Sequence, residues 1–480
     1  MKKLLCGMLS LAMLLALFAG CAQAPAAETP ASSDEASSAA SSEAPADEKV
    51  VLKLGNWPED TQTTEIELFK GYTAKFQETH PNVEVVPAYY FYALDTIVAL
   101  CESGQCPTLF QPWYTETDKL VNNGFVADMT DYLNERGWLE AMNPTIKEVV
   151  TRNGRTYGLP RDGYALGLML NLELYEEAGL MKDGLPQYPK TWDELAKTAQ
   201  TIKQKTGQGG FCLLANDNAG GWHFTNIAWG FGADLMLVAP DGKKTANVNT
   251  PEAIAAMEYV KSLKWTYDCL TADPLSENWA TGHASVGTGA AAMEIGANDA
   301  VSQLTQVNGL AVDKVALVPM PSGPKGVNML SGGTPYMFAA NSTPAQLNAA
   351  LDFIEVMGRS PEVTDDVKAG MDANNQNLVD LGVPVIPNFP IWINPDRIKL
   401  NDDSVAKYSN VDMRLFNDYF AAAAKPGMIR LEYPDAQLLY GEITKVLQAV
   451  VTDKNADVAA LMATANSNTQ ILLDGGKLPE

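Results

Sequence analysis

The spacing of hydrophobic residues changes repeatedly along the chain from position 50 onward. Residues 50–54 and 83–86 form short apolar runs, whereas residues 64–79 place apolar side chains at every third or fourth position. The first pattern predicts strands and the second predicts amphipathic helices. Because the two patterns alternate, the sequence predicts an α/β fold of mainly parallel sheets flanked by helices.

One strand is expected to be buried on both faces. Residues 165–170 are apolar or glycine at every position, and the short helix that follows ends at Gly179. A continuous apolar run is typical of a strand covered on both sides. Polar and aromatic residues stand directly before it: Arg161, Asp162 and Tyr164. We therefore predict a connecting strand that runs through the middle of the folded chain.

Capping and turn residues delimit several later elements. Thr191 is a good N-cap for a helix over residues 192–205. Pro251 opens a helix that runs through Trp265. Asp241-Gly242 predicts the turn of a β-hairpin. Two more helices are predicted near the C-terminus, over residues 437–451 and 458–473.

The central stretch resembles a known family. The likeness is carried by Tyr157-Gly-Leu-Pro160, the strand that ends in Asn171, residues 174–180 and Pro189-Lys-Thr-Trp-Asp-Glu-Leu195. These motifs are similar to those of the family 1 extracellular solute-binding proteins, the maltose-binding-like receptors of ABC importers. The resemblance spans most of residues 50–370. Residues 371–430 match it poorly, and residues 387–392 look like an insertion or a lid-like segment.

The resemblance implies a two-lobed periplasmic-binding-protein-like fold, in which crossover hinge strands join the lobes around a cleft. It assigns residues 49–160 and 298–341 to the N-terminal lobe, and residues 161–297 and 342–480 to the C-terminal lobe. It also implies that the chain recrosses between the lobes after the strand at 289–296. Such lobes close on a solute by hinge motion.

The first residues predict export. A basic start, the apolar run 4–18 and the small residues Ala19-Gly20 describe a signal peptide over residues 1–20. The run is shorter than a membrane-spanning helix requires. Cys21 resembles the modified cysteine of a lipobox, which implies a lipid anchor on the outer face of the cell membrane. A chance cysteine is the alternative. Residues 21–48 are rich in Ala, Ser, Glu and Pro and predict a disordered linker.

Charge and motifs exclude several functions. The formal net charge of −24 argues against binding to nucleic acid or anionic lipid. No nucleophile-elbow, Walker or zinc-protease motif is present, and the histidines are widely separated. A glycine pattern at 287–292 precedes a strand instead of following one, which is the wrong order for a dinucleotide site. We expect no enzyme activity, cofactor or metal, although a glycosidase-like carboxylate pair stays open.

Four cysteines follow Cys21. Cys101 and Cys106 can close a small loop, and Cys212 and Cys269 can pair across one lobe, because disulfides form outside the cytoplasm. Four free thiols are the alternative. No cysteine spacing indicates zinc.

A sugar needs aromatic rings against its C–H faces and polar side chains for its hydroxyls. The stacking candidates are Trp57, Trp113, Tyr164, Trp222 and Trp279. The hydrogen-bonding candidates are Glu116, Arg161, Asp162, Asp217, Asn298 and Asp299, to which the resemblance adds Gly333. Packing in or beside the core is the alternative for the tryptophans, and a hinge salt bridge is the alternative for Arg161 and Asp162.

The expected function is capture of a carbohydrate, in particular an oligosaccharide, and its delivery to ABC permease subunits in the membrane. The protein is expected to be a monomer that touches the membrane through its lipid anchor alone. A peptide, a polyol or another non-sugar solute is the alternative ligand. A surface carbohydrate-active enzyme is a further alternative.

Overall fold

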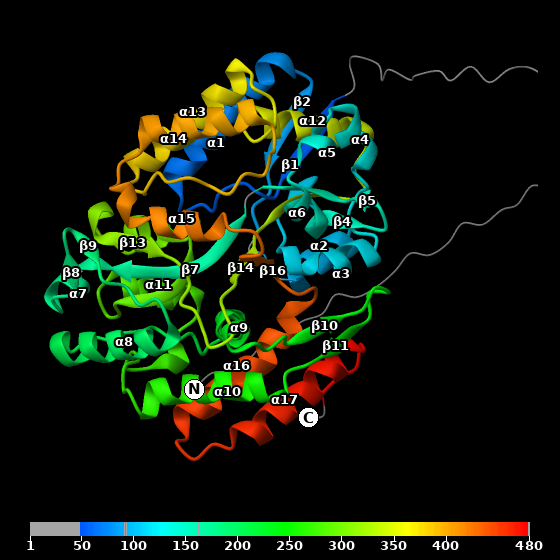
Figure 1. The fold of residues 1–480 in the computed structure, drawn as a ribbon. Helices are drawn as coiled ribbons and strands as arrows, with labels where there is room; N and C mark the ends of the chain where they lie inside the picture. The colour runs from blue at the N-terminus through cyan, green and yellow to red at the C-terminus, as the bar shows by residue number, and fades with distance from the viewer. Residues whose placement is uncertain (1–48, 91, 93, 162, 479–480) are drawn as a thin grey trace, which may run out of the picture. The chain divides into compact units, whose positions relative to one another are not determined.

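The computed structural model of the chain describes residues 49–90, 92, 94–161 and 163–478 (Figure 1). The predicted signal peptide, anchor Cys21 and linker lie outside the described residues, as does the candidate Asp162. The chain divides into Met1–Glu48 and Lys49–Glu480, and the elements of the fold belong to the second unit. No helix of the described residues has both the length and the apolar character needed to cross a membrane.

The first sheet has the order β2-β1-β3-β15-β6. Its strands are β1 (Val50–Leu54), β2 (Val83–Pro87), β3 (Leu109–Phe110), β6 (Gly158–Pro160) and β15 (Pro335–Phe338). β1 runs parallel to β2 and β3, as the alternating pattern predicts. β15 pairs antiparallel with β3 and β6, because the chain enters β15 from the other sheet.

The second sheet has the order β12-β7-β14-β16, with β13 also paired to β7. Its strands are β7 (Tyr164–Asn171), β12 (Met293–Ala297), β13 (Val315–Val318), β14 (Met329–Gly332) and β16 (Ile429–Leu431). β7 is buried over all but its first residue, which confirms the predicted central strand. β12, β13 and β14 all run antiparallel to β7, so a mainly parallel sheet is wrong for this part of the chain.

Each sheet has its own core, and we call each sheet with the elements packed on it a lobe. The first lobe contains two clusters of buried side chains. One includes Leu52 and Phe353, and the other includes Phe110. Its helices are α1 (Thr63–Thr79), α2 (Leu94–Glu102), α3 (Thr117–Asn122), α4 (Thr130–Glu135), α5 (Trp138–Ala141), α6 (Pro144–Lys147), α12 (Pro344–Val356), α13 (Asp365–Asp380) and α14 (Pro395–Tyr408).

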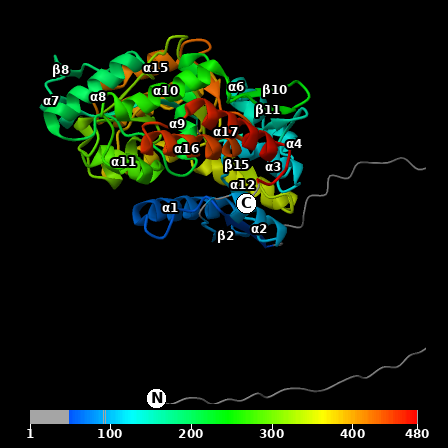
Figure 2. The ribbon, with the colours of Figure 1, turned by 90° about the horizontal axis from the view of Figure 1, so that it is seen from below.

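The second lobe contains one large cluster that includes Leu168 and Phe416. Its helices are α7 (Leu172–Glu177), α8 (Trp192–Thr206), α9 (Ala219–Phe231), α10 (Pro251–Trp265), α11 (Trp279–Gly287), α15 (Asn417–Ala423), α16 (Ala436–Thr452) and α17 (Val458–Leu473). Figure 2 shows α16 and α17 beside α9 and α10; α16 contacts both of these helices, and α17 contacts α10. The Thr191 hydroxyl accepts from Glu194 N at 3.1 Å and caps α8 as predicted.

Short hairpins and single-turn helices connect the larger helices and strands of the two lobes. The small hairpins are β4 (Thr151–Arg152) with β5 (Arg155–Thr156), β8 (Met181–Lys182) with β9 (Leu185–Pro186), and β10 (Met236–Val238) with β11 (Lys244–Ala246). The last confirms the predicted turn at Asp241-Gly242. The single-turn elements are η1 (Tyr114–Glu116), η2 (Glu148–Val150), η3 (Pro274–Ser276), η4 (Gln303–Val307), η5 (Val312–Lys314) and η6 (Met413–Leu415).

The packing differs from the implied assignment of residues to lobes at two places. Leu304 and Leu317, expected in the N-terminal lobe, lie in the core of the second lobe because β13 and β14 both pair with β7. Leu347 and Phe353, expected in the C-terminal lobe, lie in the core of the first lobe because α12 packs on β1. The chain therefore changes lobe between β6 and β7, between β14 and β15, and after α14, and not after β12. Between α13 and α14 it also reaches the core of the second lobe through Ile386 and Phe389.

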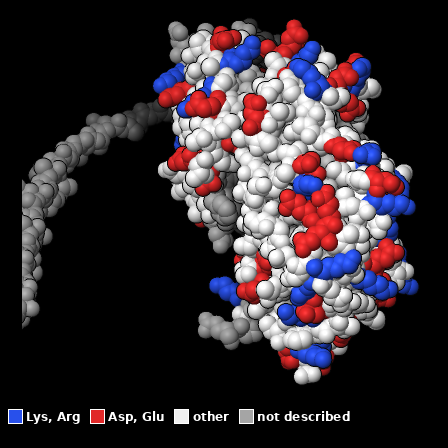
Figure 3. Space-filling view, turned by 90° about the vertical axis from the view of Figure 1, so that its left-hand side faces the viewer, with Lys and Arg blue, Asp and Glu red and all other residues white. Residues whose placement is uncertain are grey.

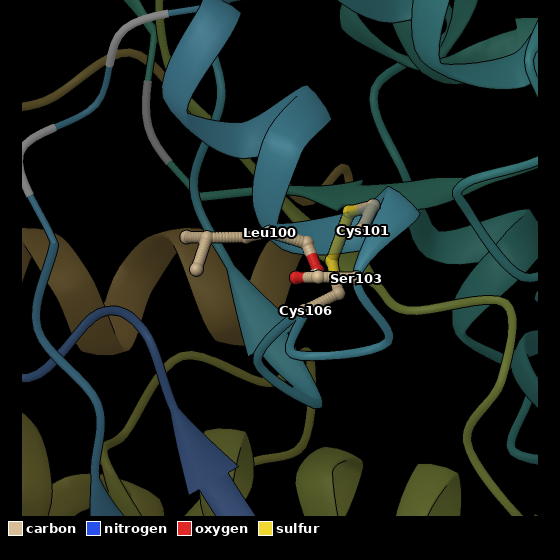
Figure 4. Close-up of a disulfide and its surroundings, with 4 residues drawn as sticks. All are labelled: Leu100, Cys101, Ser103 and Cys106. Atoms are coloured by element: carbon tan, nitrogen blue, oxygen red, sulfur yellow. A yellow bond between two sulfur atoms is a disulfide. The ribbon is translucent and has the colours of Figure 1, made fainter. Parts of the chain in front are cut away.

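Cys101 and Cys106 form a disulfide that joins the last turn of α2 to the segment before β3 (Figure 4). The Ser103 hydroxyl donates to Leu100 O at 3.0 Å inside the same turn. Cys212 and Cys269 are buried free thiols. The second pairing considered from the sequence therefore does not form.

Candidate functional site

Tyr164 begins β7 at the point where the chain enters the second lobe. Its ring lies edge-on to Trp222 of α9, with centroids 5.9 Å apart and planes at 84°. Its hydroxyl donates to Oε1 of Glu432 at 3.4 Å, and the Tyr440 hydroxyl donates to the same oxygen at 3.4 Å. Three aromatic side chains and one carboxyl thus meet beside the second sheet.

Gly332 allows this group to form. A Cβ at position 332 would lie 2.2 Å from the Tyr164 hydroxyl oxygen and 2.7 Å from Oε2 of Glu432. Both distances are well inside van der Waals contact, so a larger residue would displace the carboxyl or the ring. The end of β14 is therefore shaped around the Tyr164–Glu432 contact.

Two buried carboxyl groups give the site its electrostatic character. Burial raises the pKa of Glu432 to about 8, and the charge of Glu116 adds to the rise, while hydrogen bonds from Tyr164 and Tyr440 oppose it. Burial also raises the pKa of Glu116, against a hydrogen bond from Thr115. A buried carboxylate is stable only when donors satisfy it. A ligand rich in hydroxyl groups would supply such donors.

Glu116 approaches from the first lobe. It lies in η1, directly after the loop of Trp113, whose ring is 39% exposed and edge-on to Tyr92 at 4.9 Å. Tyr114 N donates to Gly333 O at 3.1 Å, which ties this loop to the β14–β15 crossing. Gly333 has a φ of +154°, which favours glycine at that position. Asp435 N donates to Thr115 O at 3.2 Å and joins η1 to the second lobe.

A cavity of about 680 Å³ lies beside these residues. Glu432 and Ser331 line it from the second lobe, and Tyr114 and Asp118 line it from the first. The volume falls in the range of small-molecule pockets. The cavity is therefore walled by both lobes and has one of the buried carboxyl groups at its edge.

Residues 60–363 match the family of bacterial extracellular solute-binding proteins, which is more than half of the chain. The chain belongs to this family. A Brucella abortus protein named as a binding protein is 26% identical over 203 residues, and the match covers 41% of this chain. The matched region spans 45% of the length of that curated relative.

Solved structures have the same fold as this solute-binding protein. An ABC transporter solute-binding protein from Thermotoga lettingae bound with α-D-tagatose is 18% identical, covers 88% of this chain and 98% of its own, and has a TM-score of 0.65. The Thermus thermophilus maltotriose-binding protein with maltotriose is 16% identical over 88% and 100%, with a TM-score of 0.63. A Mycobacterium tuberculosis protein with glycerophosphocholine is 15% identical over 89% and 98%, with a TM-score of 0.65.

Asn298 and Asp299 follow β12 of the solute-binding protein at the side of Tyr164. Asn298 is buried, and its Oδ1 accepts from the Tyr419 hydroxyl at 2.9 Å and from Ala165 N at 3.4 Å. Asp299 is exposed, and its charge contributes to the raised pKa of Tyr164, for which burial is the main cause. Asn298 therefore fixes the start of β7, and Asp299 adds negative charge near the site.

Trp279 and Asp217 both adjoin Asn278 at the start of α11. Asn278, the N-cap of α11, donates from Nδ2 to Asp217 Oδ2 at 3.2 Å. The Trp279 ring is 41% exposed and lies edge-on to His283 at 4.6 Å. These contacts do not join the pair to Tyr164.

Trp57 and Arg161 lie apart from the Tyr164 group as well. Trp57 packs on the core of the first lobe, edge-on to Phe69 at 5.5 Å. Arg161 lines a smaller pocket beside Phe389 and Trp392. Of the predicted residues, Tyr164 and Trp222 belong to the Tyr164 group. Trp113, Glu116 and Gly333 belong to the η1 loop and to the crossing that it bonds.

The residue that sequence reasoning missed is Glu432. It follows β16 in a segment, residues 371–430 and just beyond, where the family motifs fade. The signal was the run Leu431-Glu-Tyr-Pro-Asp435, which places carboxyl and aromatic side chains between a short strand and a long helix. Among the described residues, no three histidine, cysteine or acidic side chains are arranged to hold a metal ion.

Proposed function

We propose that this solute-binding protein captures a carbohydrate, in particular an oligosaccharide, between its lobes and delivers it to an ABC importer. The observation that carries the proposal is the Tyr164–Trp222–Glu432 group of the second lobe, in which Glu432 lies near Glu116 of the first lobe and lines a cavity of about 680 Å³. Aromatic rings stack on sugar C–H faces, and buried carboxyl groups bond sugar hydroxyls.

Closure around the solute needs few bending points. The lobes are joined where β6 leads to β7, where β14 leads to β15, and after α14. A solute that bonds side chains of both lobes has a higher affinity for the closed form and shifts the population toward it. The exposed residues Asp217, Trp279 and Asp299 would contact longer solutes, whereas Asn298 would hold the start of β7 and Trp57 would support the first lobe.

Export and anchoring complete the proposal. Residues 1–20 act as a signal peptide, Cys21 receives the lipid, and residues 21–48 tether the lobes outside the membrane. The T. lettingae structure supports an ABC transporter context, and the T. thermophilus structure supports an oligosaccharide. The M. tuberculosis structure with glycerophosphocholine favours a second candidate, capture of a non-sugar solute by the same cleft.

The test is a screen of mono- and oligosaccharides by thermal shift, followed by calorimetric titration of each hit. A bound sugar raises the melting temperature with concentration. Trp222→Ala is expected to weaken affinity about 10- to 100-fold through loss of stacking. Trp265→Ala is the control, because this exposed ring lies on α10, away from Tyr164. A response to glycerophosphodiesters alone would favour the second candidate, and steady release of sugar products would point to an enzyme.

A further inference from the structure

A second, smaller pocket lies within the first lobe. It has a volume of about 140 Å³ and is enclosed by the end of α12, by α13, by residues 388–392 and by α14. Its polar lining consists of Arg161, Arg359, Asn374, Asn388, Arg397 and Asn401, with Asn375 and Asp402 at the same wall. Most of these residues lie beyond position 363, where the family match ends.

Arg397 is held rigidly at the base of this pocket. It is 7% exposed, and its Nε and Nη2 donate to the carbonyl oxygens of Ser360 and Gly358, each at 2.9 Å. These are carbonyl groups that follow α12 and have no partner within the helix. Its Nη1 has no hydrogen-bond partner among the described residues. The two N–H donors of Nη1 are therefore unused in this buried guanidinium group.

Arg359 brings a second positive charge to the same place. It is half-buried, and its guanidinium group makes no ion pair or hydrogen bond with a described residue. Burial lowers the pKa of Arg397 to about 10, and the nearby charge of Arg359 adds to the effect. Two guanidinium groups therefore lie close together at one wall of the pocket.

One acidic neighbour outside the pocket lining partly offsets these charges, because Glu362 opposes the fall in the pKa of Arg397. Among the described residues that line the pocket, the acidic one is Asp402, which is exposed. The carboxyl group of Glu362, close enough to act on Arg397, accepts a hydrogen bond from the Trp138 indole. The chain has 58 acidic and 34 basic residues, and Figure 3 shows one cluster of acidic groups on a face where acidic and basic groups are otherwise mixed. The pocket lining, with three arginines and one exposed carboxyl group, therefore has the opposite charge balance from the chain as a whole.

We propose that this pocket binds the carboxylate of an acidic sugar, such as a hexuronate. Arg359 and the unused Nη1 of Arg397 hold the carboxylate, because guanidinium groups bind carboxylates through paired hydrogen bonds. Asn374 and Asn401, whose side chains make no hydrogen bond with described residues, bind the sugar hydroxyls. The volume admits one small ring, not a chain of rings. The pocket is distinct from the Tyr164 cavity and extends the range of solutes beyond neutral carbohydrates.

The pocket adjoins the hinge of the protein. Arg161, which lines it, stands between β6 and β7. Asn388, also in its lining, accepts from Asn298 of the second lobe at 3.5 Å. An acidic sugar in the pocket therefore lies beside the crossing between β6 and β7 and contacts Asn388, which in turn bonds the second lobe.

The experiment is calorimetric titration and thermal shift of the wild-type protein at low salt with sodium glucuronate, glucose, sodium acetate and inorganic phosphate. Glucuronate is expected to bind and to raise the melting temperature, with an affinity that falls as salt is added. Arg359→Gln is expected to weaken glucuronate binding at least about tenfold. Arg414→Gln is the matched control, because Arg414 is exposed and paired with Asp412 outside the pocket.

Melting temperatures measured without ligand distinguish a binding role of Arg359 from a structural one. Because Arg359 is unpaired and repels Arg397, Arg359→Gln is expected to leave the melting temperature unchanged or to raise it. Trp222→Ala is expected to retain glucuronate binding, which distinguishes this pocket from the Tyr164 cavity. Absence of glucuronate binding, equal binding by Arg359→Gln, loss of stability in ligand-free Arg359→Gln, or binding of phosphate or acetate as tight as that of glucuronate would each overturn the proposal.

Discussion

Lys244 Nζ lies 3.0 Å from Oδ2 of Asp118 and so joins the β10–β11 hairpin of the second lobe to α3 of the first. The same ammonium group lies 2.5 Å from Oδ2 of Asp435, and Arg152 also bonds Asp118. The side chains of Lys244 and Asp118 are 17% and 19% exposed. This ion network spans the lobes at the edge of the 680 Å³ cavity, so it is placed to stabilise the closed form.

Removal of the ammonium group is expected to favour an open protein. In Lys244→Met the partly buried contact between the lobes is lost, at a cost of about 1 kcal/mol to the closed form. Small-angle scattering is expected to show a larger radius of gyration without ligand, and titration a solute affinity about fivefold weaker. Lys399→Met, which removes an exposed pair within α14, is the control. An unchanged radius and affinity would show that the network does not govern closure.

Glu432 is expected to make stability depend on pH. Because its pKa is raised to about 8 by burial, the folded protein binds a proton that the unfolded chain has released above its ordinary value of 4.5. Stability without ligand therefore falls as pH rises from 4.5 toward 8. Thermal melts at several pH values are expected to show this slope in the wild type and a flatter one in Glu432→Gln. The exposed Glu84→Gln is the control, and an equal slope in all three proteins would contradict the prediction.

Two glycine substitutions are expected to act in opposite directions. Gly332→Ala places a methyl group against Tyr164 and Glu432 and is expected to cost about 1–3 kcal/mol and to weaken solute binding. Gly71→Ala meets no atom within 4 Å and lies inside α1, so it is expected to stabilise the fold by about 0.5–1 kcal/mol. Denaturant melts measure both changes. A neutral Gly332→Ala would show that the Tyr164 group can relax.

Loss of the Cys101–Cys106 disulfide is expected to destabilise the first lobe. The bond closes a loop with a sequence separation of 5, for which the chain-entropy relation gives about 2 kcal/mol. Reduction, or the double substitution Cys101→Ser with Cys106→Ser, is expected to lower the melting temperature. It should also loosen the turn before β3 that leads to Trp113. Cys212→Ser is not a suitable control, because it alters a buried free thiol. Iodoacetamide labelling after reduction is instead expected to show that Cys101 and Cys106 are the thiols released when stability is lost.

Several elements were predictable because their signals are local. The helix Pro251–Trp265 has the predicted bounds, α17 runs over the predicted 458–473, and the Asp241-Gly242 turn closes the predicted hairpin. In each case a cap, a turn residue or a repeat of hydrophobic positions fixes the backbone within a few residues. The buried strand β7 and its neighbouring motifs also gave the family correctly.

The candidate site was only half predictable. Tyr164, Trp222 and Glu116 were identified as ligand candidates, and the fold places Tyr164 and Trp222 in direct contact and Glu116 close enough to raise the pKa of Glu432. Glu432 was not identified, since it lies 268 positions from Tyr164 along the chain. Local sequence patterns do not indicate which residues so far apart along the chain are in contact.

By itself, the amino-acid sequence determined many of the strands and helices outside residues 371–430, the burial of β7 on both faces, and the family to which the protein belongs. Only the tertiary structure decided that β13 and β14 stay with β7, that α12 to α14 return to the first lobe, and that Arg359 and Arg397 share a pocket. The physical reason is that hydrophobic spacing records how deeply a residue is buried. The partner against which it is buried is chosen by competition among distant segments for the same sheet edges and core surfaces.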